Sequence, residues 1–459
     1  MSERKNGMLA ITGGRVIDPS QGIDRVADVL IKDGKIESIA RAGSAPDGYQ
    51  KIDAGGRVVA PGFVDLHTHL REPGLEYKET LATGTAAAAR GGFTTVCAMP
   101  NTEPAQDTAS IIEYVARRAR ESGVVRVLPI GAVTMGRHGK QLTEMAEMAA
   151  AGAIGFSDDG DPVADPNMMR QALSYSSSLG LPIINHCQEP GLTRGAQMHE
   201  GVVSSNLGLA GWPAEAEASM VARDIALAEL TGGRLHIAHL STAAAVDLVR
   251  AAKARGARVT AEVTPHHLTL TDTWVYGLKG AERRSAVGLA SYDTNTKVNP
   301  PLRAASDVDA LVAALGEGVI DFVATDHAPH SESEKACTYV EAANGISNLE
   351  TAFASVVSLF HAGRLSMPQV IERMSTAPGK FLALGKRHGE EARFGLFGTL
   401  KPGHPADVVV LDLNAEWVVD PARFVSKGKN TPLAGVTLKG RVVTTVFGGS
   451  VVWQGGASA

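Results

Sequence analysis

Hydrophobic and polar positions follow two different patterns along this chain. Near both ends, short β-branched runs are separated by Gly, Asp and Pro turns, as in LAITGGRVIDPS early on and LKGRVVTTVFGGSVVW late in the chain. Such runs are typical of strands joined by tight turns. In the long middle part, Ala-rich segments alternate with short apolar runs. That alternation indicates βαβ units and a parallel sheet.

Eight apolar runs in the middle part are candidate strands. Segments such as TEMAEMAAAGA and TAAAVDLVRAAKARGA separate them and are expected to be helical. Eight βα units predict an α/β fold of the (β/α)₈ TIM-barrel type. The runs are 63–69, 93–100, 125–133, 153–159, 181–187, 234–241, 258–267 and 320–330.

The two β-rich ends are expected to form one small domain beside the barrel. We predict that residues 1–58 and 391–459 build this discontinuous β-sandwich domain, and that residues 59–390 form the barrel. No sequence repeat or low-complexity linker divides the chain.

Composition and charge exclude several classes of protein. The 459 residues are 44% hydrophobic and 20% charged, with a formal net charge of −5, so neither a nucleic-acid-binding face nor a polybasic membrane patch is indicated. The start MSERKNGMLAITGG lacks the apolar core of a signal peptide, and no run reaches transmembrane length. Cys97, Cys187 and Cys337 are too few and scattered for a disulfide framework. We expect a soluble cytoplasmic protein.

Polar side chains suited to chemistry follow seven of the eight runs. Active sites of (β/α)₈ barrels occupy the rim where the carboxyl ends of the strands converge. A merely structural role would scatter polar residues through the loops instead. The residues at these ends are His67 and His69, Asn101, Asp158 and Asp159, His186, His239, His266 and His267, and Asp326.

The segment GFVDLHTHLREPG places His67, His69 and Arg71 on alternate positions. In an extended strand such positions point to the same side, so the three basic side chains are expected to converge. Imidazole and carboxylate ligands suit a divalent ion such as zinc. His67 and His69 can therefore hold one ion together, and we favour a site over an exposed strand face.

Further ligands can come from other strands. His186 and His239 end apolar runs, although a single histidine in that position is more often a hydrogen-bonded packing residue. Asp326 can bind a metal and also move protons, and Asp159 could bridge two ions. Such a set permits a binuclear site in which a shared water becomes a hydroxide nucleophile.

Several neighbours of these residues are expected to play supporting parts. His236 lies three positions before His239, which places it on the opposite face, where a packing role is favoured. Asp65 is expected to be buried beneath the histidines. For His266 and His267, supporting or loop roles are favoured.

Eight motifs, taken in order, closely resemble those of bacterial dihydroorotases, which belong to the cyclic amidohydrolases of the (β/α)₈ type. The resemblance covers nearly the whole chain. The motifs are PGFVDLHTHLREPG, AMPNT, GFSDDG, NHCQE, HIAHLST, TPHHL, KVNPPLR and ATDHAPH.

This resemblance implies two zinc ions per subunit, bridged by an acidic group and a hydroxide. Many cyclic amidohydrolases use a carboxylated lysine as the bridge, but GAIGFSDDG has no lysine and Ser157 stands about where one would be expected. The aspartate-bridged type is therefore implied, with Asp159 favoured over Asp158, which could instead bond to the following loop. The implied ligands are His67, His69 and Asp326 for one ion, and His186 and His239 for the other.

The resemblance also implies a reaction. The hydroxide attacks the ring amide carbonyl, and Asp326 takes the proton and delivers it to the departing ring nitrogen. This step interconverts (S)-dihydroorotate and N-carbamoyl-L-aspartate, and in a cell it would run toward ring closure in pyrimidine (UMP) biosynthesis.

Arg71 is the implied partner of the substrate carboxylate, because a guanidinium can bind a carboxylate with two parallel hydrogen bonds. His69, Asn101, Asn299 and His330 would complete the recognition. Without the motifs, the favoured roles would be a loop cap for Asn101, a turn residue for Asn299 and a solvated loop histidine for His330.

Two stretches depart from the pattern of the relatives. In AANGISNLET, Gly345 matches them, but Asn344 replaces an aromatic residue, so substrate contact there would use the backbone. The segment 271–298 is longer than expected, and it could be a lid or a subunit contact.

Three rival functions can be weighed against dihydroorotase. A hydantoinase, dihydropyrimidinase or allantoinase would share the hydrolytic core, but Arg71 and Asn101 argue for a ring that carries a carboxylate. A non-catalytic scaffold for aspartate transcarbamoylase would be expected to lack metal ligands. A metal-dependent deaminase fits LREPG and MPNT poorly. We predict a dihydroorotase that forms a homo-oligomer, with aspartate transcarbamoylase as a candidate partner and neither nucleic acid nor membrane as a ligand.

Overall fold

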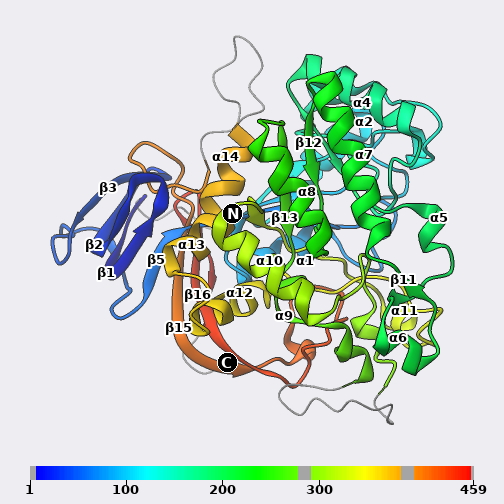
Figure 1. The fold of residues 1–459 in the computed structure, drawn as a ribbon. Coiled ribbons are helices and arrows are strands. Elements are labelled where there is room, and N and C mark those ends of the chain that lie inside the picture. Colours follow the sequence, from blue (N-terminus) through cyan, green and yellow to red (C-terminus); the bar gives the residue numbers. More distant parts are fainter. Residues whose placement is uncertain (1–6, 278–290, 384–396, 456–459) are drawn as a thin grey trace.

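The computed structural model describes residues 7–277, 291–383 and 397–455 (Figure 1). It has an α/β architecture in which helices surround short parallel strands, and a larger sheet lies at one side. The predicted domain boundary at residues 390 and 391 lies outside the described residues.

The parallel strands form two sheets. One has the order β6-β7-β8 and the other β14-β13-β12-β9. Their residues are almost all buried, as expected for parallel strands that helices cover. The strands are β6 (Phe63–Thr68), β7 (Phe93–Ala98), β8 (Arg126–Pro129), β9 (Pro182–Asn185), β12 (Arg234–Ile237), β13 (Val259–Val263) and β14 (Phe322–Val323).

The candidate strand at 153–159 is reduced to a single bridging residue, which corrects the prediction. Phe156 forms isolated parallel bridges to Gly131, two residues after the end of β8, and to Ile183 of β9. Beyond it, the Asp158 side chain accepts hydrogen bonds from the backbone N–H groups of Val133 and Thr134, so side-chain bonds take over from the strand pattern there.

A further isolated bridge pairs Thr68, at the end of β6, with His327, beyond β14. Like the bridges of Phe156, it is parallel and joins the two sheets. The two sheets are therefore connected at both of their outer strands.

The longer helices follow the strands, and each packs against the next long helix along the chain. The packed pairs are α1 and α2, α2 and α3, α3 and α4, α4 and α7, α7 and α8, and α8 and α10. Their local sequences explain them: Thr242 caps α8 by accepting the N–H of Ala245, and the residues that α8 buries recur at helical spacing. The predicted helices at 143–153 and 242–257 are confirmed by α3 and α8. These helices are α1 (Leu81–Arg90), α2 (Ala109–Ser122), α3 (Met145–Ala151), α4 (Pro166–Leu179), α7 (Glu215–Thr231), α8 (Ala243–Ala254), α10 (Ala305–Glu317) and α12 (Ala352–His361).

Short elements lie in the connections. They are α5 (Pro190–Thr193), β10 (Met198–His199), α6 (Val202–Leu207), β11 (Gly211–Trp212), α9 (Pro265–Thr269), η3 (Asp272–Tyr276), η4 (Thr294–Thr296), α11 (Glu332–Lys335), α13 (Met367–Ile371), η5 (Glu372–Thr376) and α14 (Ala377–Ala383), with the turns η1 (Pro19–Gln21), η2 (Met135–Arg137) and η6 (Pro421–Arg423).

Both β-rich ends of the chain contribute to one eight-stranded sheet of order β17-β16-β15-β5-β1-β2-β3, with β4 paired to β1. β5 spans the predicted boundary between residues 58 and 59, and it pairs with β1 on one side and β15 on the other. Figure 1 shows β1–β3 in blue and β15 and β16 in orange to red at the side of the molecule away from α5. The strands are β1 (Met8–Asp18), β2 (Ile23–Lys32), β3 (Lys35–Arg41), β4 (Gln50–Asp53), β5 (Val58–Pro61), β15 (Val408–Val418), β16 (Thr437–Phe447) and β17 (Ser450–Gln454).

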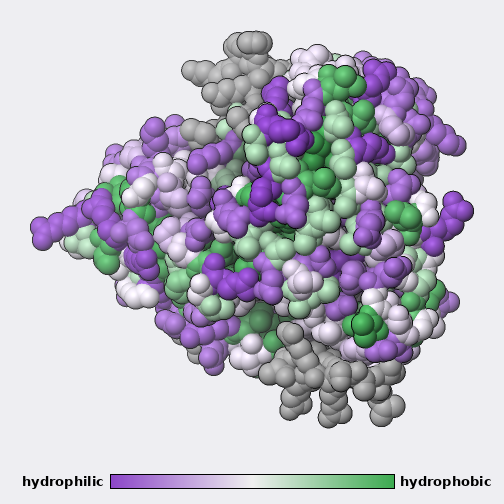
Figure 2. Space-filling view, viewed as in Figure 1, coloured by the Kyte–Doolittle hydropathy of each residue, from purple (hydrophilic) through white to green (hydrophobic). Residues whose placement is uncertain are grey.

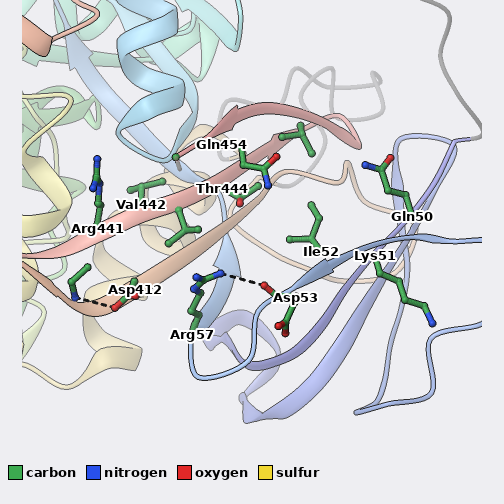
Figure 3. A pocket seen from close by; sticks show the side chains of 14 residues that line it. Gln50, Lys51, Ile52, Asp53, Arg57, Asp412, Arg441, Val442, Thr444 and Gln454 are labelled. Atoms are coloured by element: carbon green, nitrogen blue, oxygen red, sulfur yellow. Dashed lines mark hydrogen bonds between the residues drawn. The ribbon is translucent and has the colours of Figure 1, made fainter. Parts of the chain in front are cut away.

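A hollow of about 780 Å³ lies over this sheet, beside β4, β16 and β17 (Figure 3). In it, Arg57 donates a hydrogen bond to the backbone oxygen of Asp53 at 3.3 Å. No histidine and no predicted site residue is among the described residues that line it. The predicted chemistry therefore lies elsewhere.

The face drawn in Figure 2 carries hydrophobic side chains scattered among hydrophilic ones. None of the helices within the described ranges combines the length and the apolar character needed to cross a membrane.

Candidate metal centre

The predicted ligand residues come together beyond the carboxyl ends of the parallel strands. His67 belongs to β6 and His69 follows it, while the others come from the segments after β9, β12, β14 and the Phe156 bridge. Each is at most 4% exposed. The six residues are His67, His69, Asp159, His186, His239 and Asp326.

Asp159 lies between two pairs of imidazoles. Its Oδ2 is 3.3 Å from Nε2 of His67 and 3.4 Å from Nε2 of His69. Its Oδ1 is 3.2 Å from Nδ1 of His186 and 3.0 Å from Nε2 of His239. Each carboxylate oxygen therefore faces one histidine pair, which is the arrangement that a bridging ligand of two metal ions requires.

Asp326 completes the group around the first pair. Its Oδ1 lies 3.0 Å from Nε2 of His69 and 3.6 Å from Nε2 of His67. Asp326 and His239 both have a positive φ, 46° and 32°, in the left-handed region that residues with a Cβ seldom adopt. Such backbone conformations occur where a functional arrangement holds them in place.

Asp158 and Asp159 have different surroundings. Asp158 accepts hydrogen bonds from the N–H of Val133 at 2.9 Å and from the N–H and hydroxyl of Thr134 at 3.0 and 2.6 Å. Its oxygens are engaged in holding that loop, whereas both oxygens of Asp159 face imidazoles.

The donor set fits divalent metal ions. Neighbouring nitrogen donors around one tetrahedral zinc lie about 3.3 Å apart, given bonds of about 2.0 Å. Here His186 and His239 are 2.9 Å apart, His67 and Asp326 are 3.6 Å apart, and the donor atoms of His67, His69 and Asp326 all lie within 4.8 Å of one another. The buried Nε2 of His67 has no hydrogen-bond partner within the described ranges, although two carboxylates lie within 3.6 Å of it, as expected of a metal-ligand atom.

The electrostatics of the group keep the carboxylates ionised. Burial opposes their charge, but the charge of His67 and hydrogen bonds from His186 and His239 hold the pKa of Asp159 well below its usual range. Likewise, burial opposes ionisation of Asp326, yet the hydrogen bond from His69 and the charge of His67 lower its pKa. Metal binding requires carboxylates in this deprotonated form.

Glu262 is a site residue that the sequence reasoning missed. This buried side chain of β13 places Oε1 2.6 Å from Nδ1 of His67 and Oε2 3.1 Å from Nε2 of His236. Despite burial, the charges of His67 and His236 lower its pKa to about 2. A carboxylate at Nδ1 keeps the proton there and turns Nε2 toward Asp159. The acid within RVTAEV was an available signal, because a buried charge requires a partner.

Asn101 supports His69 in the same way. Its Oδ1 lies 2.7 Å from Nδ1 of His69, so it holds the ring with Nε2 toward Asp326. The loop-cap alternative does not account for this contact.

The supporting residues lie as expected. Asp65 is fully buried and accepts hydrogen bonds from the N–H of His67 and from both the N–H and the hydroxyl of Thr325. His236 stacks on Phe322, with ring centroids 5.1 Å apart, in agreement with a packing role. The carboxylate of Asp65 thereby ties β6 to the segment that carries Asp326.

His266 and His267 are held by neutral partners. Nδ1 of His266 accepts a hydrogen bond from Asn348 at 2.8 Å. The ring of His267 contacts the hydroxyl of Thr264 and the backbone oxygen of Pro300. Both rings are fully buried, and burial lowers the pKa of each.

Arg71 reaches the site from a loop, which corrects the expectation of a strand running through it. β6 ends at Thr68, and Arg71 has φ 64°, because its chain turns away to pack against the segment after β14. There its Nε donates to the backbone oxygen of Pro329, and its Nη2 lies 3.4 Å from Nε2 of His330. Burial lowers the pKa of Arg71 to about 10, so the side chain is still a cation at neutral pH.

The remaining predicted substrate residues lie in the loops on either side of α11 and in the loop after η4. Nε2 of His330 is 2.9 Å from the backbone oxygen of Asn344. Gly345 has φ 149°, and a Cβ there would be 2.7 Å from the backbone oxygen of Ala328, so only glycine fits. Asn299 donates its amide N–H to Oε1 of Gln188 at 3.0 Å.

The long segment 271–298 is described only at its flanks, which carry η3 and η4. Its central residues, 278–290, lie outside the described residues, and the predicted lid or subunit contact falls on them.

Comparisons with known proteins bear on this centre. A family model described as Dihydro-orotase-like matches residues 56–245. The dihydroorotase of Anaeromyxobacter dehalogenans (strain 2CP-1) is 49% identical over 447 residues, which is 97% of this chain and 98% of the relative. The dihydroorotase of Pelotomaculum thermopropionicum is 50% identical over 449 residues, with 97% and 98% covered.

Solved structures resemble the chain over nearly its full length. The L-hydantoinase (dihydropyrimidinase) of Arthrobacter aurescens has a TM-score of 0.83 at 25% identity and covers 98% of this chain and 96% of its own. The D-hydantoinase of a Thermus species has a TM-score of 0.77 at 26% identity, with the same shares. With the identities to the named relatives, these findings show that the chain belongs to the dihydroorotase family, whose members are hydrolases that act on cyclic amides.

Proposed function

We propose that this protein is a zinc-dependent dihydroorotase that interconverts N-carbamoyl-L-aspartate and (S)-dihydroorotate in pyrimidine biosynthesis. The observation that carries the proposal is Asp159, whose two oxygens face two separate histidine pairs at 3.0 to 3.4 Å. Identities of 49 and 50% to dihydroorotases support the choice of substrate.

The proposal includes a closed (β/α)₈ barrel over residues 59–390, with a small β domain from 1–58 and 391–459. The parallel bridges at Phe156 and between Thr68 and His327 support closure, because they join the outer strands of both sheets. Closure places the candidate ligands on one rim.

Two zinc ions would be held within the donor set. When bound, such a pair lowers the pKa of a bridging water and polarises an amide carbonyl. The protein supplies ionised carboxylates, and it fixes the imidazoles of His67 and His69 through Glu262 and Asn101. The holding residues would be His67, His69 and Asp326 for one ion, His186 and His239 for the other, and Asp159 for both.

Asp326 would move the proton. As water adds to the ring carbonyl, its proton passes to the carboxylate of Asp326; when the carbon–nitrogen bond breaks, the same proton goes to the ring nitrogen. The contacts with His69 and His67 lower the pKa of Asp326 and keep it in the ionised form that proton uptake requires.

Arg71 would bind the substrate carboxylate, since it stays cationic while buried. His69, Asn101, Asn299, His330 and the backbone of Asn344 and Gly345 would line the rest of the pocket. The same pocket would distinguish this protein from a hydantoinase, whose ring carries no carboxylate for Arg71. A cytoplasmic location, a homo-oligomeric state and aspartate transcarbamoylase as a candidate partner belong to the proposal on the strength of the family resemblance.

The deciding experiment measures ring opening by the zinc-loaded protein on dihydroorotate, hydantoin and allantoin in parallel. We expect turnover of dihydroorotate alone. We also expect Asp326→Ala to lose about 10²- to 10⁴-fold in kcat while keeping some bound zinc, because its proton transfer matters more than its share in binding. Preferential turnover of hydantoin or allantoin would contradict the substrate, and inactivity on all three would favour the scaffold alternative.

A further inference from the structure

Gln188 lies where the candidate metal centre meets the candidate substrate pocket. It follows β9 by three residues, and its backbone N–H contacts the sulfur of Met220. Its side-chain oxygen Oε1 is 2.8 Å from Nε2 of His186 and 3.0 Å from Nδ2 of Asn299. One atom thus contacts a predicted metal ligand and a predicted substrate residue.

The orientation of the Gln188 amide is fixed from its other end. Nε2 of Gln188 donates to the hydroxyl of Thr193 at 2.9 Å. That hydroxyl donates in turn to the backbone oxygen of Glu189, so it faces Gln188 with a lone pair. The nitrogen of the amide must point to Thr193, and the oxygen must point to His186 and Asn299.

This orientation determines the tautomer of His186. An amide oxygen accepts hydrogen bonds only, so Nε2 of His186 carries the proton. Its Nδ1, which lies 3.2 Å from Oδ1 of Asp159 and 2.9 Å from Nε2 of His239, is therefore the nitrogen left to bind an ion. That is the tautomer that can bind a metal ion.

The same oxygen determines how Asn299 presents its amide. One N–H of Asn299 is engaged with Gln188, which leaves its second N–H and its oxygen for a ligand. That oxygen is buried and, among the described residues, has no donor. A buried acceptor in this condition is expected to receive a hydrogen bond from a bound molecule.

We infer that Gln188 is a positioning residue that couples zinc binding at His186 to substrate binding at Asn299; the substrate half of this inference rests on the proposed function. Loss of the Oε1 acceptor of Gln188 removes a hydrogen bond from His186 and from Asn299 at the same time. Because coupling between two binding sites is reciprocal, zinc and substrate should each strengthen the binding of the other through this residue.

The test compares Gln188→Met, which keeps the length but loses the acceptor, with Gln188→Glu, which keeps it. Zinc affinity is measured by competition with a chelator, and KM and kcat are measured on dihydroorotate. We expect Gln188→Met to weaken zinc binding about tenfold and to raise KM about tenfold, with a smaller effect on kcat. Gln188→Glu should restore zinc affinity. Thr193→Val removes the acceptor that orients the amide, so it should change both constants in the same direction but less than Gln188→Met. The exposed Leu192→Met is the matched control and should change neither.

Asn299→Ala separates the two halves of the inference. In that background, Gln188→Met should still weaken zinc binding but should no longer raise KM. Zinc affinity unchanged in Gln188→Met, or KM effects that simply multiply in the double variant, would overturn the inference. If the unmodified protein does not turn over dihydroorotate, the proposed function fails, and the zinc measurement alone still decides whether Gln188 positions His186.

Discussion

Asp158 and Asp159 are adjacent residues of one type, and their surroundings give them different tasks. Three donors from Val133 and Thr134 engage both oxygens of Asp158 and hold them toward the loop. Asp159 keeps both oxygens toward imidazoles. The sequence places both residues after an apolar run. It does not tell which of them faces the histidines, because that depends on the loop of Val133 and Thr134, which comes from another part of the chain.

At this scale, the histidines were predictable and their partners were not. His67, His69, His186 and His239 end apolar runs, a local pattern that can be read along the chain. Glu262 acts across strands, so its partner depends on which strands are neighbours, and that information is absent from local spacing.

We predict that Glu262→Gln weakens zinc binding about 10- to 100-fold, because the loss of charge at Nδ1 of His67 weakens the donor strength of Nε2. The measurement is chelator competition on the purified variant. Glu229→Gln is the control: it makes the same change at an exposed glutamate of α7 that pairs with Arg255, so zinc affinity should change little. Equal zinc affinity in Glu262→Gln and in the unmodified protein would contradict the role.

Among the elements, the segment that follows β14 carries much of the predicted pocket and is held by a buried lysine. Nζ of Lys335 donates to the backbone oxygens of Thr294, Lys297 and Ala343, at 3.1, 3.2 and 2.6 Å. Burial lowers the pKa of Lys335 to about 7, while three carbonyl acceptors favour its charged form. The contacts hold this segment against the one that contains η4.

We predict that Lys335→Met raises KM for dihydroorotate roughly tenfold, because three buried carbonyls lose their donor and the segment that carries His330 and Gly345 shifts. The effect on kcat should be smaller, since Asp326 is held separately through the bridge of His327 to Thr68. Steady-state kinetics test this, with the exposed Lys401→Met as the matched control. A lower kcat at unchanged KM would contradict it.

Element prediction succeeded where a local signal was complete. The Ala-rich runs gave α3 and α8, since apolar spacing and caps lie within each helix. The run at 153–159 looked like its neighbours, but a strand needs paired residues along its whole length, and only Phe156 of this run forms bridges on both sides.

For the whole molecule, the β-branched runs and turns shared by the two ends of the chain predicted that these ends would pack together, and their strands do form one sheet. The strand order could not be predicted, because alternation tells which face of a strand is buried and not which strand lies beside it.

Buried His266 links the stability of the whole molecule to pH. Asn348 donates to its Nδ1 and also to the backbone oxygen of Thr325, so the ring is neutral with its proton on Nε2. Burial lowers the pKa of His266 to about 4, whereas the unfolded chain has an ordinary value of about 6.5. Between these values, the unfolded chain binds a proton that the folded protein does not bind.

We predict that this group makes the zinc-free protein lose stability as the pH falls from about 6.5 to about 4, by up to roughly 1.4 kcal/mol per pH unit. His266→Leu removes the group, so its stability should fall less steeply over this range. Denaturant unfolding at successive pH values measures both slopes. Parallel curves for the two proteins would contradict the prediction.

The position of β5 has a consequence for the order in which the molecule can be made. β5 pairs with β1 on one side and β15 on the other, and β15 begins roughly 350 residues later. A ribosome that adds roughly 5 to 20 residues per second needs about 20 to 70 s to cover that interval. Throughout it, the nascent sheet presents the free edge of β5 to other chains, and such edges promote aggregation. Chaperone protection is therefore most needed in the interval before residue 408 leaves the ribosome.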